Sequence, residues 1–138
     1  MEYISIVRKL LTLLSLTCLV GCTASSPNYK TVPLPSGKQV KVIGIGRINF
    51  SQGPPALMLK YQTDLNVADK GTLRSEVDEI WPVFKNDVEQ AHMSSAIISA
   101  NEIPRGVLIK SSQSYNFVYE KSADGTWRSL DDGRRSTE

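Results

Sequence analysis

One long amphipathic segment, with short runs of alternating polarity before and after it, is the feature that most limits the folds open to this sequence. Between Asp69 and His92, apolar side chains recur every three or four residues, which is the period of one face of an α-helix. This apolar stripe consists of Leu73, Val77, Ile80, Trp81, Phe84, Val88 and Ala91. Asp69 or Thr72 can cap the first N–H groups. Pro82 cannot donate to the carbonyl of Asp78, so we expect a kink between these two residues or, alternatively, a break into two helices.

Segments with the two-residue period of a β-strand lie on both sides of this helix. They are residues 38–50, 56–64, 95–100, 114–121 and 126–130, and residues 106–111 are a further candidate. A turn at Pro54-Pro55 predicts an antiparallel hairpin between the first two strands. Asp124-Gly125 predicts another hairpin between the last two, because this dipeptide favours tight turns.

These elements predict an α+β fold, with one mostly antiparallel sheet of five or six strands and a single kinked helix packed on one face. The expected order is β-β-α-β-β-β, which does not separate a cystatin-like from a ferredoxin-like arrangement. The inward faces of three strands are expected to meet the helix stripe: Leu57, Leu59, Tyr61, Ala96, Ile98, Tyr115, Phe117 and Tyr119. We expect a single domain at residues 38–130 and a frayed tail at residues 131–138.

Residues 22–37 precede this domain and are rich in Ser, Thr and Pro, a composition typical of a tether. The alternative is that Val32 and Leu34 add an edge strand to the domain, since proline is tolerated at sheet edges.

The first 22 residues have the three zones of a secretory signal peptide. A short start ends in Arg8 and Lys9, an apolar run without charge follows, and small polar residues come next. The uncharged stretch from Leu10 to Ala24 is 15 residues long. A helix needs about 20 apolar residues to cross a bilayer, so a permanent membrane span is the less favoured interpretation.

Leu19-Val20-Gly21-Cys22 resembles the lipobox of bacterial lipoproteins, and the resemblance covers only this leader. In that family the cysteine thiol receives a diacylglyceryl group, the signal peptidase cuts just before it, and the new amino group is acylated. The resemblance implies a signal peptide at residues 1–21, palmitate-type acyl chains on Cys22 and a domain facing the periplasm. An aspartate after the cysteine often marks inner-membrane retention in this family. Thr23 stands there instead, which favours the outer membrane.

The chain that would remain after processing offers little electrostatic or cysteine chemistry. Cys18 would leave with the leader, so Cys22 would be the one remaining cysteine and no disulfide or cysteine metal site could form. Residues 22–138 hold 14 basic and 13 acidic side chains, a net charge of +1, which gives no case for nucleic acid as a partner.

No motif in the domain predicts catalysis, a cofactor or a metal. His92 is the single histidine and is best explained as a partner of the helix dipole at its C-terminal end. Glu89 precedes it by three residues, but di-metal sites of this spacing need a second copy. Gly44-Ile45-Gly46 lacks the third glycine and the following helix of a dinucleotide-binding loop. The serines lack the G-x-S-x-G pattern of a nucleophile elbow.

Trp127 and Arg128 are the remaining candidates for contact with a partner. Both are of the types enriched at protein interfaces, although core packing of Trp127 is the favoured interpretation. Glu76 lies beside the apolar stripe, where we expect a solvated flank.

The leading hypothesis is a non-enzymatic binding or accessory module, held to the envelope membrane through Cys22, with a protein or cell-wall partner. The alternatives are an inhibitor or immunity-type lipoprotein, a small envelope enzyme using His92 with Glu89 or a serine, and a domain with a small-ligand pocket.

Overall fold

The computed structural model describes residues 30–105 and 112–131. The expectations for the signal peptide, for lipidation of Cys22, for a strand at residues 106–111 and for most of the tail lie outside these residues and stay predictions.

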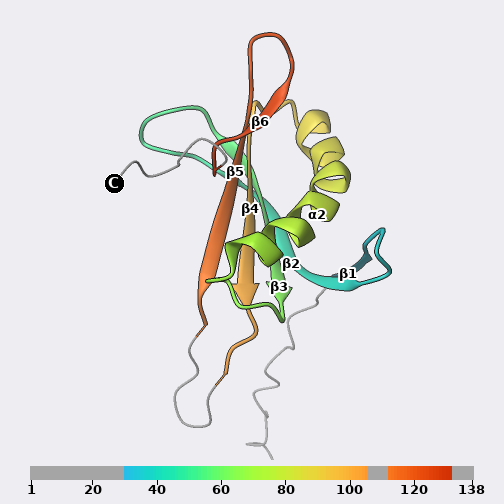
Figure 1. The fold of residues 1–138 in the computed structure, drawn as a ribbon. Coiled ribbons are helices and arrows are strands. Elements are labelled where there is room, and N and C mark those ends of the chain that lie inside the picture. Colours follow the sequence, from blue (N-terminus) through green and yellow to red (C-terminus); the bar gives the residue numbers. More distant parts are fainter. Residues whose placement is uncertain (1–29, 106–111, 132–138) are drawn as a thin grey trace, which may run out of the picture.

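Six strands form one sheet in sequential order, β1-β2-β3-β4-β5-β6, and one helix packs on one face of it (Figure 1). The strands are β1 (Lys30–Pro33), β2 (Gln39–Ile48), β3 (Ala56–Thr63), β4 (Ser95–Glu102), β5 (Ser114–Lys121) and β6 (Trp127–Ser129). Helix α2 (Lys70–Gln90) connects β3 to β4, which are therefore parallel. The other neighbouring pairs are antiparallel. The predicted α+β fold is confirmed, including both hairpins.

The boundary at residue 38 was placed too late, because three strands precede the helix instead of two. β1 comes from the segment assigned to the tether and pairs with the start of β2, with Val32 opposite Val40. Leu34 is buried, and its N–H donates to the Lys38 carbonyl. Pro33 ends the strand, as expected for proline at a sheet edge. The globular part therefore includes residue 30.

α2 is one continuous helix of 21 residues, so the alternative of a break at Pro82 is wrong. Asp69 caps it, because its Oδ1 accepts from the Thr72 N–H at 3.2 Å. Figure 1 shows the helix axis bending between its two halves, and Pro82, which removes one backbone hydrogen bond, accounts for a bend there.

The helix ends at Ala91, and His92 then adopts a left-handed φ of 54°. The N–H groups of His92 and Met93 donate to the carbonyls of Glu89 and Val88. This pair of hydrogen bonds is a Schellman motif, which satisfies two of the last backbone carbonyls of the helix.

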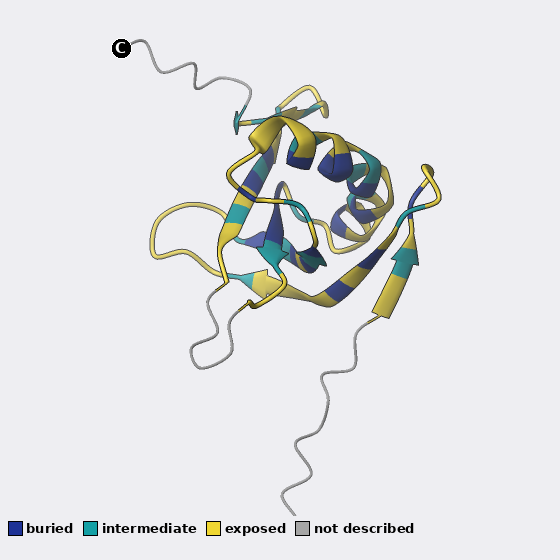
Figure 2. Ribbon diagram, turned by 60° about the horizontal axis from the view of Figure 1, so that its bottom comes forward, coloured by how far each residue is buried: buried dark blue, intermediate teal, exposed yellow. Residues whose placement is uncertain are grey.

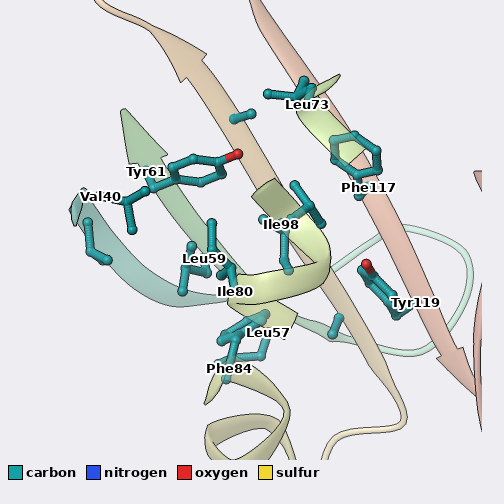
Figure 3. Packing of buried hydrophobic residues seen from close by; sticks show 14 of the residues in the cluster. Val40, Leu57, Leu59, Tyr61, Leu73, Ile80, Phe84, Ile98, Phe117 and Tyr119 are labelled. Atoms are coloured by element: carbon teal, nitrogen blue, oxygen red, sulfur yellow. The ribbon is translucent and has the colours of Figure 1, made fainter. Parts of the chain in front are cut away.

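The core lies between the apolar stripe of α2 and one face of the sheet, as the alternation of buried and exposed residues in Figure 2 shows. Figure 3 shows side chains from β2, β3, β4 and β5 converging on those of the helix. The sequence predicted this for β3, β4 and β5, and β2 adds Val40 and Val42. Trp81 stacks on Tyr119 with ring centroids 3.9 Å apart and meets Trp127 edge-on at 5.2 Å.

A β-bulge at Ile43 changes the course of β2. Val42 pairs with Tyr61, but Gly44 pairs with Lys60, so Ile43 is an extra residue with no partner on β3. The alternation of faces shifts by one residue at this point. Without the bulge, Ile45 would point away from the helix.

Candidate binding groove

The second half of β2 has an open edge. β1 pairs only with residues 39–42, and within the described residues nothing pairs with the β1 side of Gly44–Ile48. In a strand with a partner on one side, every second residue directs its N–H and C=O to the other side. Gly44, Ile45, Gly46 and Arg47 are all exposed. A Cβ built on either glycine would meet no atom within 4 Å, so the backbone can be approached closely.

An apolar crevice opens beside this edge, between β2 and the second half of α2. It has a volume of about 80 Å³, and Ile45 and Val83 lie on its two sides with 49% of each residue exposed. Its other lining residues are Lys30, Val32, Leu34, Val40, Val42, Leu59, Ile80, Phe84 and Asp87, of which Figure 3 shows Val40, Leu59, Ile80 and Phe84. The bulge brings Ile45 to this side.

The size of the crevice limits what it can hold. Pockets for small molecules typically have about 300–1,000 Å³, and a cavity of about 150 Å³ holds one benzene molecule. At about 80 Å³, this crevice suits a single apolar side chain. The expected small-ligand pocket between helix and sheet is not supported by this volume.

A second hollow, of about 290 Å³, lies on the face of β2 and β3 turned away from the helix. It shares Ile45 with the crevice and is otherwise lined by Gly44, Gly46, Arg47, Ile48, Met58 and Lys60. Two cations and no anion border it. The open edge of β2 thus lies between an apolar crevice on one side and a basic hollow on the other.

The charge around the edge is positive. Lys30, Lys41, Arg47 and Lys60 lie on β1, β2 and β3, and none of them forms an ion pair with another residue in the described part of the chain. Arg47 donates only to the Asn49 side chain, at 3.2 Å. Asp87, at the crevice, is the one acidic residue lining either hollow.

The wall of the crevice formed by β1 is held to the helix by an ion-pair cluster. Lys38 Nζ lies 2.5 Å from Glu76 Oε2 and 2.8 Å from Asp64 Oδ1. The Ser36 N–H donates to Glu79 Oε2 at 2.8 Å. The turn between β1 and β2 is therefore attached to α2 at two points. Glu76 was expected to be a solvated flank, but it is buried, because Lys38 reaches it from this turn.

The pKa shifts in this cluster favour the charged pair. Burial opposes the charge of Lys38, but its hydrogen bonds to Asp64 and Glu76 outweigh burial and raise the pKa of the ammonium. The hydrogen bond from Lys38 lowers the pKa of Asp64. Burial, and then the negative charge of Glu76, raise the pKa of Tyr61 far above its ordinary value. Tyr61 therefore stays neutral, and the cluster acts as a structural support.

His92 and Glu89, which the enzyme hypothesis combined, have different surroundings. His92 is exposed and sits in the helix-ending turn. Glu89 faces β5 and β6 instead: its Oε1 accepts from Trp127 Nε1 at 3.1 Å and lies 3.8 Å from Lys121 Nζ. Within residues 30–105 and 112–131, no three His, Cys, Asp or Glu residues gather as metal ligands.

The candidate partner contacts lie on β6, at the sheet edge opposite β1. Trp127 is half-buried against Trp81, in line with the favoured interpretation of core packing. Arg128 is exposed and lies opposite Glu120 on β5. A partner contact at these two residues stays a prediction.

Comparison of the chain with protein-family models, with curated protein sequences and with solved structures finds no match. In the part of the chain that the structure describes, no helix is both long enough and apolar enough to span a membrane.

Proposed function

We propose that the protein is a lipid-anchored envelope lipoprotein whose domain faces the periplasm and acts as a non-enzymatic binding or accessory module. The lipobox residues Leu19–Cys22 and the zoned leader support the anchor. The observation that carries the binding role is the open edge of β2 beside the apolar crevice, because unpaired backbone next to exposed apolar side chains is a surface made for another chain.

The start of β1 at Lys30 shortens the expected tether. Eight Cα–Cα steps separate Cys22 from Lys30, and an extended chain covers at most about 3.6 Å per step. The sheet would therefore begin less than about 30 Å from the acylated residue. The N-terminal end of β1, and with it the open edge of β2, would face partners close to the membrane surface.

Intact-mass measurement of the protein purified from membranes tests the anchor. We expect a chain that starts at Cys22 and carries acyl mass, whereas the Cys22→Ala variant should keep its leader and carry no lipid. Thr23→Asp is the matched sorting control, because it should shift the lipidated protein toward the inner membrane. A wild-type chain that starts at Met1 without acyl mass would overturn the proposal.

An inhibitor or immunity-type lipoprotein is a special case of the same binding role. The enzyme alternative requires His92, and a His92→Ala variant with an unchanged cellular phenotype would remove it.

A further inference from the structure

We propose that the groove between β2 and α2 binds an extended, acidic segment of a partner protein by β-strand addition. The incoming strand would pair with Gly44–Ile48, insert one apolar side chain between Ile45 and Val83, and place acidic side chains beside Arg47 and Lys60. This inference rests on the proposed binding role and specifies the chemistry of the partner.

The backbone geometry sets the length of the bound segment. Five residues of β2, Gly44–Ile48, follow the bulge beyond the end of β1, which corresponds to about 17 Å of strand. An added strand there would lie in the same row as β1, on the same side of β2. Main-chain hydrogen bonds would supply affinity, and the pockets for alternate side chains would supply specificity, as in other cases of strand addition.

Side-chain alternation then fixes the pattern of the partner. The residue opposite Ile45 points to the helix side, where the crevice of about 80 Å³ accepts one apolar side chain such as leucine. Its neighbours on either side point to the basic hollow that Lys60 borders. The residue two positions along points again to the helix side, beside Arg47. A leucine flanked by acidic residues satisfies all three positions.

Other occupants fit the same surface less well. A second copy of this chain, pairing antiparallel along Gly44–Ile48, would place Arg47 of both copies on the same face of the paired strands, and like charges that are neighbours across a strand pair are destabilising. An anionic membrane surface would also attract these cations, and headgroup oxygens can accept from backbone N–H groups. Lipid headgroups do not, however, present alternating donors and acceptors at the spacing of a β-strand, which the N–H and C=O groups of an open edge require. An acidic extended peptide meets both requirements.

The test uses the full chain purified from membranes in zwitterionic detergent. The probe is an acetylated, amidated peptide of about nine residues, with a central leucine, two glutamates on each side of it and threonines at the ends. We expect saturable binding, with slowed amide hydrogen exchange confined to β2 residues 43–48. The double variant Arg47→Glu/Lys60→Glu should weaken binding by at least about tenfold. The matched control Arg128→Glu, an exposed reversal on the opposite edge, should change it by less than about twofold.

A second pair of measurements separates the apolar contact from charge alone. Val83→Asn changes an exposed side chain, so the fold should survive while peptide affinity falls by at least about fivefold. A probe with serine in place of its leucine should show the same loss. Equal affinity for the serine and leucine probes would overturn the role of the crevice.

Three results would overturn the inference as a whole. The amides of residues 44–48 that point away from β3 could already be protected without peptide, anionic vesicles could protect these amides while the peptide does not, or no binding could be seen at millimolar peptide. The mass measurement on Cys22 is independent of all three. A lipidated chain that binds no peptide would refute the binding groove but not the lipid anchor. An unlipidated chain that binds the peptide would refute the lipid anchor but not the binding groove.

Discussion

Removing Lys38 should cost more stability than removing its buried partner Glu76. In Lys38→Met the Glu76 carboxylate, whose side chain is 3% exposed, loses its cation while remaining out of water. Breaking a buried ion pair in this way costs about 3–5 kcal/mol. The side chain of Lys38 is itself 36% exposed, so water can partly replace it, and we expect about 2–3 kcal/mol. For a domain of this size, that loss lowers the melting temperature by roughly 10–15 °C.

Glu76→Gln provides the matched comparison. It removes the buried charge but keeps a polar group in place, and Lys38 retains Asp64 and solvent, so the expected cost is about 1 kcal/mol. In the double variant Lys38→Met/Glu76→Gln, the cation and the buried carboxylate are both removed, so no unpaired buried charge remains. Its cost should therefore fall below the sum of the two single costs by at least about 1 kcal/mol. Urea unfolding followed by circular dichroism measures all three. A Lys38→Met variant as stable as Glu76→Gln would refute the reasoning.

Three further predictions follow from single contacts. His92→Gly should stabilise the protein by about 1 kcal/mol in urea unfolding, because glycine adopts φ 54° without the cost that a Cβ adds; a loss of stability would contradict this. Asp64→Asn should be less stable than the wild type by under about 1 kcal/mol at pH 6, because the side chain of Asp64 is exposed and its lowered pKa stabilises the fold only above the ordinary value of 3.8. The free energies of unfolding of the two proteins should become equal as the pH falls through the lowered pKa of Asp64, and a difference that does not change with pH would count against the Lys38 contact. Arg47→Gln should increase self-association in sedimentation, because the Arg47 side chains of two copies would repel each other across paired open edges; an unchanged monomer would argue against that repulsion.

The elements that the sequence predicts well are those whose signals are local. α2 begins and ends within two residues of the predicted segment, because the capping side chain of Asp69 and the apolar stripe are both properties of neighbouring residues. β5 matches its prediction at both ends, since Tyr115, Phe117 and Tyr119 alternate without interruption. In each case burial of one face reinforces the local preference.

The features that the sequence predicts less well depend on residues far apart in the chain. An edge strand with Val32 and Leu34 was only the alternative to a tether, because β1 has the composition of a linker and forms a strand through the pairing of Val32 with Val40 across a turn. Glu76 is buried only because Lys38 approaches from 38 positions away. The bulge at Ile43 changes which face Ile45 occupies, and the neighbouring glycines were its only sequence signal.

The cations on the edge of β2 have a simpler explanation that must be weighed against the binding groove. Lysine and arginine on an edge strand are a common defence against pairing with other chains. A strand that is only defended has no use for exposed apolar residues, yet Ile43 and Ile45 are 40% and 49% exposed on this very edge. Val83 adds a third apolar side chain from the helix, across the crevice. The cations together with the exposed apolar side chains repel a basic strand and favour an acidic strand that carries one apolar side chain. The edge is therefore selective for one kind of partner strand and not closed to all of them.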